Sequence, residues 1–253
     1  MYITWLDSNS WLIEMGGQRI LLDPWLVGTL VFGNLPWLFK GSRLADRPIP
    51  ENIDLILLSQ GLEDHAHPPT LQQLDRNIPV VASPNAAKVV RQLGYTQITV
   101  LAHEESFTFA EKVKIQAKPG SLVGPMLVEN GYLLVDLTSN TTLYYEPHGN
   151  HSPSLKNIAP VDVVITPIID LEIPFVGSII KGQKSAIQLI EWLKPQVIMP
   201  TAAGGDITFE GLLISLLRSQ GNANEFRNAL AENNLKTEVV EPLPGERFEL
   251  KLV

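Results

Sequence analysis

Short runs of apolar residues, some continuous and some alternating with polar ones, recur along the chain and predict a protein rich in β-strands. Residues 1–6, 10–15 and 19–22 are predicted to form three strands, and Gly16-Gly17 fits a hairpin turn between the last two. Residues 53–59 (IDLILLS) are almost entirely apolar. Such a run is typical of a strand that is buried on both faces.

The rest of the chain mixes predicted strands and helices. Further strands are predicted at residues 80–82, 98–101, 106–109, 113–117, 126–129, 131–137, 142–145, 161–165, 196–199, 237–240 and 248–252. Helices are predicted at residues 68–75, 85–93, 181–193, 209–219 and 224–233. Strands between 106 and 145 follow one another without crossover helices, so they favour a meander over a doubly wound parallel sheet. The whole order predicts two sheets packed face to face, one from each half of the chain, with helices outside.

Composition limits the classes of protein that fit. The chain has 253 residues, 45% of them hydrophobic, which suits one large α/β domain or two small ones with a substantial core. The longest uncharged apolar stretch, residues 25–39, contains two glycines and a proline and falls short of the ~18–20 residues of a membrane-spanning helix. A formal net charge of -8, without clusters of Lys or Arg, argues against a nucleic-acid partner.

The residue types also limit the chemistry. The chain has no cysteine, so disulfides and thiolate metal sites are excluded, and any metal must be held by His, Asp, Glu or backbone oxygen. The first residues, MYITW, lack the basic region of a signal peptide, and we expect a cytoplasmic protein.

Four of the five histidines fall into two clusters. His65 and His67 lie in one short segment, and His148 and His151 lie in another. Each segment directly follows a predicted strand, and strand ends are where ligands and catalytic groups collect in α/β folds. A metal or catalytic site is therefore one interpretation of the two clusters, and ordinary surface or core histidines are the other.

Several segments resemble the metallo-β-lactamase superfamily, in particular its lactonase-like branch of metal-dependent hydrolases. The segments that carry the resemblance are ITWLDSNSWLIEMGGQRILLDPWL, the run from Gln60 to His65, TTLYYEPHG, VDVVITPI, KPQVIMPT and EVVEPLPGERFEL. The resemblance implies one domain over residues 1–253, with a four-layer αββα sandwich of two mixed β-sheets flanked by helices. In fold-class terms this is an α/β (α+β) protein.

The family motif His-x-His-x-Asp-His is incomplete in this chain. Gln60 and Leu62 occupy its first two histidine positions, and leucine cannot coordinate a metal. No histidine lies at residues 119–122, where a third is expected, and the position of the last family histidine falls near Ala202. The resemblance thus implies that the first of the family's two metal sites is absent.

The second family site survives in part. Asp64 and His65 match its motif positions, and His148 aligns with the aspartate that normally bridges the two metals. Two imidazoles and a carboxylate suit one divalent metal, zinc first and manganese or iron as alternatives, which could lower the pKa of water toward ~7. Asp64 and His148 would be the catalytic residues. Additional ligands, or groups that orient the ligands, could come from Gln60, His67, Glu146 and His151.

Three functions compete on these residues. The first is a mononuclear metal-dependent hydrolase for an ester, lactone or phosphoester with an apolar portion. The second is a catalytically inactive relative without a metal, in which the vacated cleft binds a small molecule or protein. The third is metal-free catalysis with His65 or His148 as general base and Asp64 orienting it.

Structural roles compete with the functional ones. Asp64 could cap a helix or turn, His65 could be a buried histidine bonded to backbone, and Asp23 could hold the turn before Pro24. The apolar loops 25–39 and 168–180 could pack on each other. They could instead form a substrate pocket, a homo-oligomer contact or a transient membrane contact.

Overall fold

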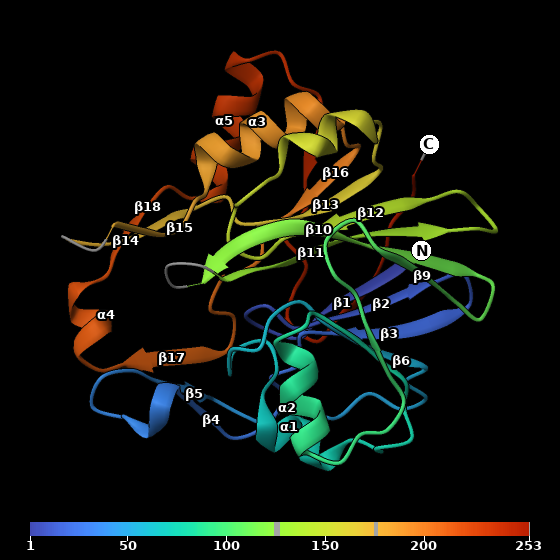
Figure 1. The fold of residues 1–253 in the computed structure, drawn as a ribbon. Helices are drawn as coiled ribbons and strands as arrows, with labels where there is room; N and C mark the ends of the chain where they lie inside the picture. Colours follow the sequence, from blue (N-terminus) through green and yellow to red (C-terminus); the bar gives the residue numbers. More distant parts are fainter. Residues whose placement is uncertain (124–126, 175–176, 253) are drawn as a thin grey trace.

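Two large sheets form the centre of the molecule (Figure 1). The computed structural model describes residues 1–123, 127–174 and 177–252. The strands of the first sheet are, in spatial order, β20 (Arg247–Glu249), β1 (Tyr2–Trp5), β2 (Trp11–Met15), β3 (Gln18–Leu22), β6 (Leu55–Leu58), β7 (Val80–Ala82) and β8 (Ile98–Val100). The strands of the second are β19 (Glu238–Val239), β16 (Val197–Met199), β13 (Val163–Ile165), β12 (Thr142–Tyr145), β11 (Leu127–Asp136), β10 (Val113–Val123) and β9 (Ser106–Phe109).

Both sheets are mixed. In the first, β1, β2 and β3 are antiparallel, whereas β3, β6, β7 and β8 run parallel. In the second, β9 to β12 form an antiparallel meander, and β12, β13, β16 and β19 run parallel. The meander predicted from the sequence is therefore present. The prediction of one sheet from each half of the chain does not hold for the C-terminal strand β20, which joins the first sheet.

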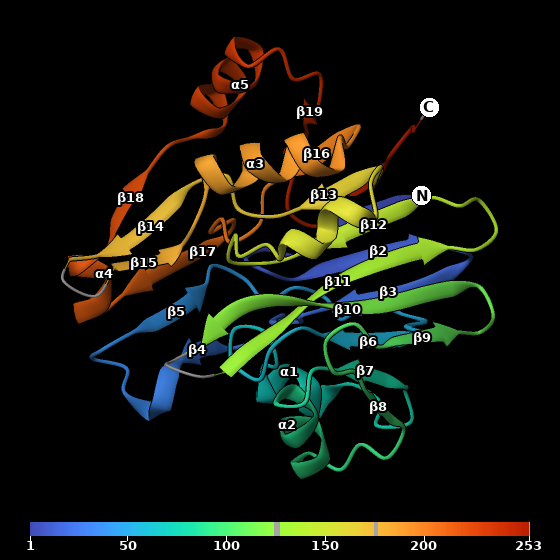
Figure 2. The ribbon, with the colours of Figure 1, turned by 45° about the horizontal axis from the view of Figure 1, so that its top comes forward.

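Helices cover the outer face of each sheet, which gives four layers (Figures 1 and 2). Helices α1 (Pro68–Gln73) and α2 (Ala86–Gln92) pack on the first sheet. Helices α3 (Gln183–Leu193) and α5 (Ala223–Glu232) pack on the second. This is the αββα sandwich that the resemblance implied. Among the described residues, no helix combines the length and apolar character needed to cross a membrane.

Strand β6 shows how the apolar pattern builds these layers. Leu55 and Leu57 point into the core between the sheets, whereas Ile56 and Leu58 point toward α1 and α2. Because side chains alternate along a strand, a strand covered on both faces needs apolar residues at every position. The unbroken apolar run of residues 55–58 has this cause.

The apolar loops contain small sheets that the local pattern did not predict. One consists of β4 (Thr29–Val31), β5 (Lys40–Arg43) and β17 (Ile207–Glu210), with the 3-10 turn η1 (Phe32–Asn34) between the first two. The other consists of β14 (Asp170–Ile173), β15 (Gly177–Ile180) and β18 (Arg218–Gln220). Phe175 of the second apolar loop lies outside the described residues.

The predicted helix at 209–219 is wrong for most of its length. Only α4 (Leu212–Leu216) is helical, between β17 and β18. Strand β17 pairs with β5, which is far away in sequence, and no local pattern reveals such a partner. Gly211, with φ of 115° and the Leu38 carbonyl oxygen 2.7 Å from where its Cβ would lie, starts α4 abruptly. Residues predicted as two strands at 126–129 and 131–137 form the single strand β11, and Met126 lies outside the described residues.

Asp136, at the end of β11, ties the two sheets together. Its carboxylate accepts hydrogen bonds from the backbone N–H of Gly16 (2.9 Å), between β2 and β3, and from the N–H (2.8 Å) and hydroxyl (2.6 Å) of Thr138. Burial alone would raise the pKa of Asp136, but these hydrogen bonds outweigh burial and lower the pKa to about 2.

We expect Asp136→Asn to lower the free energy of unfolding by roughly 1–2 kcal/mol at pH 7. The folded-state pKa lies below the ordinary 3.8, so the stabilisation is complete above pH 4 and is lost as the pH falls toward 2. Urea denaturation at a series of pH values should show wild type and variant converging between pH 4 and 2. A gap that stays constant over this range would contradict the assignment.

Candidate metal centre

The ends of three strands bring the two histidine segments together. Strands β3 and β6 are parallel neighbours, so Asp23 after β3 lies beside Ser59 after β6. His148 follows β12 of the other sheet, and its ring meets the ring of His65 edge to face, with centroids 5.2 Å apart. Ligand atoms of Asp64, His65 and His148 all lie within 4.8 Å of one another. The predicted convergence of the two segments is therefore present.

Asp23 fixes the orientation of the His65 ring. The His65 Nδ1–H donates to Asp23 Oδ2 at 2.7 Å, and this oxygen also accepts the Tyr145 hydroxyl at 2.7 Å. The Ser59 N–H donates to the other oxygen, Oδ1, at 2.7 Å, and the Ser59 hydroxyl donates to Oδ2. All four side chains are fully buried. With Nδ1 held in this way, His65 presents Nε2 to Asp64 Oδ2, 3.3 Å away.

Two carboxylates control the charge of His65. Burial alone would lower the pKa of His65, but Asp64 and Asp23 outweigh burial and raise it to about 10. Burial alone would raise the pKa of Asp64, but the charge of His65 outweighs it and lowers the pKa. In the metal-free protein, His65 is thus an imidazolium between two carboxylates, with a proton where a metal would bind.

A carboxylate also supports His148, but it acts through an intervening serine. His148 Nδ1 lies 2.9 Å from the Ser121 hydroxyl, which donates its own proton to the buried Glu146. Because that proton is committed, the Ser121 oxygen accepts from His148, which places the histidine proton on Nδ1. Burial lowers the pKa of His148 to about 4, so the ring is neutral and its Nε2 has a free lone pair. Burial also raises the pKa of Glu146 to about 7.

Gln60 occupies the space beside His148 that a family histidine would fill. The structure places its Nε2 3.0 Å from His148 Nδ1. Its Oε1 is buried and has no hydrogen-bond partner among the described residues. Exchanging the two amide atoms would turn Oε1 toward a protonated Nδ1, in agreement with the tautomer that Ser121 favours. Leu62, at the second family position, contributes only its carbonyl oxygen, which accepts the N–H of His65 at 3.0 Å.

The donor set fits one divalent metal. Two imidazoles offer Nε2, and each has its Nδ1 proton held by a hydrogen bond that leads to a carboxylate, an arrangement typical of metal-binding histidines. The third donor, Asp64, has an oxygen, Oδ1, that is buried and lacks a hydrogen-bond partner in the described part of the chain. A buried carboxylate oxygen without a partner is costly, and a cation would satisfy it.

His67 and His151 lie outside this cluster. His67 is the N-terminal cap residue of α1, and its ring nitrogens contact the Thr70 hydroxyl (3.0 Å) and the Thr29 carbonyl oxygen (3.2 Å). Burial lowers its pKa to about 4. His151 lies between Tyr144 and Thr166, with ring nitrogens 3.4 and 3.5 Å from their hydroxyls. The roles of these residues, of Gln60 and of Glu146 as extra ligands stay predictions.

The structure adds residues that the sequence analysis did not place at the site. Asp23 was interpreted as a turn residue, yet it holds His65, while Tyr145, Ser121 and Asn9 were not singled out. The site role of Asp23 could have been predicted. Asp23 ends the second strand of a hairpin, and this strand lies in the same sheet as residues 55–58. Ser121 had no local signal, since its partners Glu146 and His148 lie on another strand end.

Comparison with known proteins finds similarity over most of the chain. The family model for the Beta-lactamase superfamily domain matches residues 2–202. Over an alignment of 267 residues, the chain is 23% identical to the UPF0173 metal-dependent hydrolase MK1542 of Methanopyrus kandleri, with 98% of this chain and 100% of the relative covered.

Solved structures with the same fold cover nearly the whole chain. A possible metal-dependent hydrolase from Veillonella parvula has a TM-score of 0.74 at 15% sequence identity, with 99% of each chain covered. The isothiocyanate hydrolase from Delia radicum gut bacteria has a TM-score of 0.71 at 16% identity, again with 99% of each chain covered. At such identities the likeness establishes the fold alone.

The charge pattern of the histidines can be measured. We expect ¹⁵N NMR of metal-free protein to show His65 protonated on both nitrogens up to about pH 10, with His148 and His151 neutral above about pH 4 and 3. Asp23→Asn should lower the pKa of His65, because one of its two carboxylate partners is lost. Titration of His65 near its ordinary 6.5 would contradict this account of the buried cluster.

Proposed function

This chain belongs to the β-lactamase superfamily, and on that premise we propose that it is a mononuclear metal-dependent hydrolase whose metal ligands are Asp64, His65 and His148. One observation carries the proposal. Two histidines from different sheets and one carboxylate place ligand atoms within 4.8 Å of one another, and Nδ1 of each histidine is engaged in a buried hydrogen bond. Gln60 and Leu62 stand at the first two histidine positions of the family motif, which supports one metal rather than two.

The relatives support the reaction class. MK1542 of Methanopyrus kandleri is described as a metal-dependent hydrolase, and the similar fold from Delia radicum gut bacteria is an isothiocyanate hydrolase. A divalent ion in this site would supply a Lewis acid and lower the pKa of water toward ~7.

The chain's own residues then have distinct tasks. Asp23 and the Ser121–Glu146 pair keep the Nδ1 protons of His65 and His148 in place, so both rings keep Nε2 directed at the cluster. The oxygen of Asp64 that does not hold the ion would be available to accept a hydrogen bond from the attacking water. Asp64 and His148 remain the residues to which we assign catalysis.

Apolar side chains near the motif support a substrate with an apolar portion. The Gly33 N–H lies 3.5 Å from Glu63 Oε1, which places the turn after β4 next to the 60–65 motif. Around this turn, Leu35 and Trp37 are 41% and 62% exposed. We therefore propose an ester, lactone or phosphoester whose apolar part contacts residues 32–37.

A binding module remains a second candidate, and one observation favours it. The imidazolium of His65 between Asp23 and Asp64 neutralises much of the cluster without any metal. A chain that binds no metal would retain a stable, closed charge network here. The cleft could then bind a small molecule without turnover.

Metal affinity should rise with pH. The metal must displace the Nε2 proton of His65, whose pKa is about 10, so binding at neutral pH releases one proton. We expect the apparent affinity for Zn²⁺ to increase by roughly tenfold per pH unit between pH 6 and 9. Calorimetric titrations in buffers of different ionisation enthalpy measure both the affinity and the released proton. Affinity without pH dependence would contradict the assignment of His65 as a ligand.

Variants separate the metal hydrolase from the binding module. We expect His148→Ala to lower Zn²⁺ affinity by at least about 10-fold and to abolish hydrolysis of 4-nitrophenyl esters, because one of three ligands is lost. His103→Ala, an exposed histidine away from the cluster, is the control and should change neither. Elemental analysis of the purified protein gives the stoichiometry. Wild-type protein that stays metal-free after supplementation with Zn²⁺, Mn²⁺ or Fe²⁺ would favour the binding module.

A further inference from the structure

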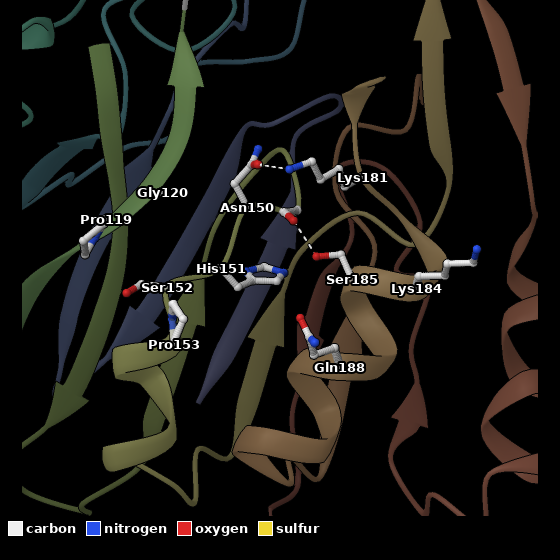
Figure 3. Close-up of a pocket in the computed structure, with 11 residues that line it drawn as sticks. Pro119, Gly120, Asn150, His151, Ser152, Pro153, Lys181, Lys184, Ser185 and Gln188 are labelled. Atoms are coloured by element: carbon white, nitrogen blue, oxygen red, sulfur yellow. Dashed lines mark hydrogen bonds between the residues drawn. The ribbon is translucent and has the colours of Figure 1, made fainter. Parts of the chain in front are cut away.

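An open cavity of about 610 Å³ is lined by residues that neighbour His148 and Ser121 in sequence (Figure 3). Its lining comes from the segment after β12, the start of the 3-10 turn η2 (Pro153–Asn157), residues 119–120 of β10, and the start of α3. Its polar lining includes Asn150, His151, Lys181, Lys184, Ser185 and Gln188.

The wall of the cavity is tightly built. Lys181 donates its backbone N–H to the His148 carbonyl oxygen (2.9 Å) and its side-chain ammonium to Asn150 Oδ1 (2.8 Å). The Ser185 hydroxyl donates to the Gly149 carbonyl oxygen. A Cβ on Gly149 would lie 1.7 Å from the Lys181 carbonyl oxygen, so only glycine permits this approach. Figure 3 shows Asn150 and Lys181 joined at one end of the cavity, with the His151 ring between Ser152 and Ser185.

All charged residues that line this cavity are positive. Lys181 and Lys184 line it, and no carboxylate is among its lining residues. A second cavity of about 660 Å³, beside the end of α3, is lined by lysines together with Glu191 and Glu238. The chain as a whole carries a net charge of -8, so a purely cationic lining is a local exception. Anions would be attracted to this cavity and not to the protein in general.

His151 adds a neutral polar group to the same lining. Burial, and after it the charge of Lys181, lowers the pKa of His151 to about 3. The ring is therefore neutral at physiological pH and can donate or accept a hydrogen bond. Its contacts with Tyr144 and Thr166 are long, at 3.4 and 3.5 Å, and leave the ring free to bond a ligand.

Two residues connect the cavity to the metal cluster. Gly120 lines the cavity, and the next residue, Ser121, contacts His148 Nδ1. Gly149 also lines the cavity and directly follows His148. Cavity and cluster thus involve neighbouring residues on β10 and on the segment after β12.

We propose that this cavity binds the anionic group, a carboxylate or a phosphate, of the substrate that is hydrolysed at the metal centre. The inference rests on the proposed function and deepens it by naming the substrate class, an anionic ester or lactone. Lys181 supplies the charge nearest the cavity, with Lys184 at its rim, and Asn150 and His151 supply polar contacts. The apolar portion of the substrate would lie on the other side, toward residues 32–37.

Binding of inorganic phosphate to metal-free full-length protein tests the cavity itself. We expect saturable binding by calorimetry or NMR that weakens with added salt and falls by roughly tenfold in Lys181→Ala/Lys184→Ala. Lys236→Ala/Lys251→Ala, which removes two lysines from the second cavity, is the matched control and should leave the affinity unchanged. Equal loss in both double variants, or no saturable binding to wild type, overturns the proposal.

Hydrolysis of paired probes tests the role in catalysis. In metal-loaded protein, the Lys181→Ala/Lys184→Ala variant should raise KM for 4-nitrophenyl succinate, which carries a carboxylate, and leave 4-nitrophenyl acetate unchanged. An equal effect on both esters overturns the anionic substrate class. Phosphate binding without any metal binding would leave the cavity intact and refute only the proposed hydrolase, so the two failures are distinguishable.

Discussion

A buried carboxylate, that of Asp23, is the group on which the candidate site depends. It lies at the end of β3, and its hydrogen bonds come from Ser59 and His65 after β6 and from Tyr145 on β12 of the opposite sheet. A buried charge is tolerated only when it is fully hydrogen-bonded or paired, so the two sheets must close around it in one arrangement. That arrangement also fixes which nitrogen of His65 points at Asp64.

A hydrogen-bond chain that ends on a carboxylate also orients His148, and this chain includes one more residue than that of His65. Ser121 passes the hydrogen bond from the ring to Glu146, and Gln60 fills the remaining space where the family carries a histidine. The two imidazoles thus come from different sheets and meet edge to face, and Nδ1 of each is engaged in a hydrogen bond. The chain therefore keeps the fold and brings together three groups that could hold one metal ion.

The sequence predicted the parts of the molecule that local pattern and a family motif can reveal. The continuous apolar run before Ser59, the meander, and the convergence of the His65 and His148 turns are present in the structure. Local pattern did not predict strands β17 and β18, because each pairs with a strand far away in sequence. The role of Asp23 was missed for a related reason, because three of its partners belong to later parts of the chain. Local pattern cannot assign a residue whose function lies in contacts across the two sheets.

The most direct test of the central claim is anomalous diffraction from crystals of zinc-loaded protein. This account predicts one anomalous peak about 2.0–2.2 Å from Nε2 of His65, from Nε2 of His148 and from an oxygen of Asp64, with Asp23 still bonded to Nδ1 of His65. A peak elsewhere on the molecule, or an His65–Asp64 ion pair that persists without metal in saturating zinc, would contradict it.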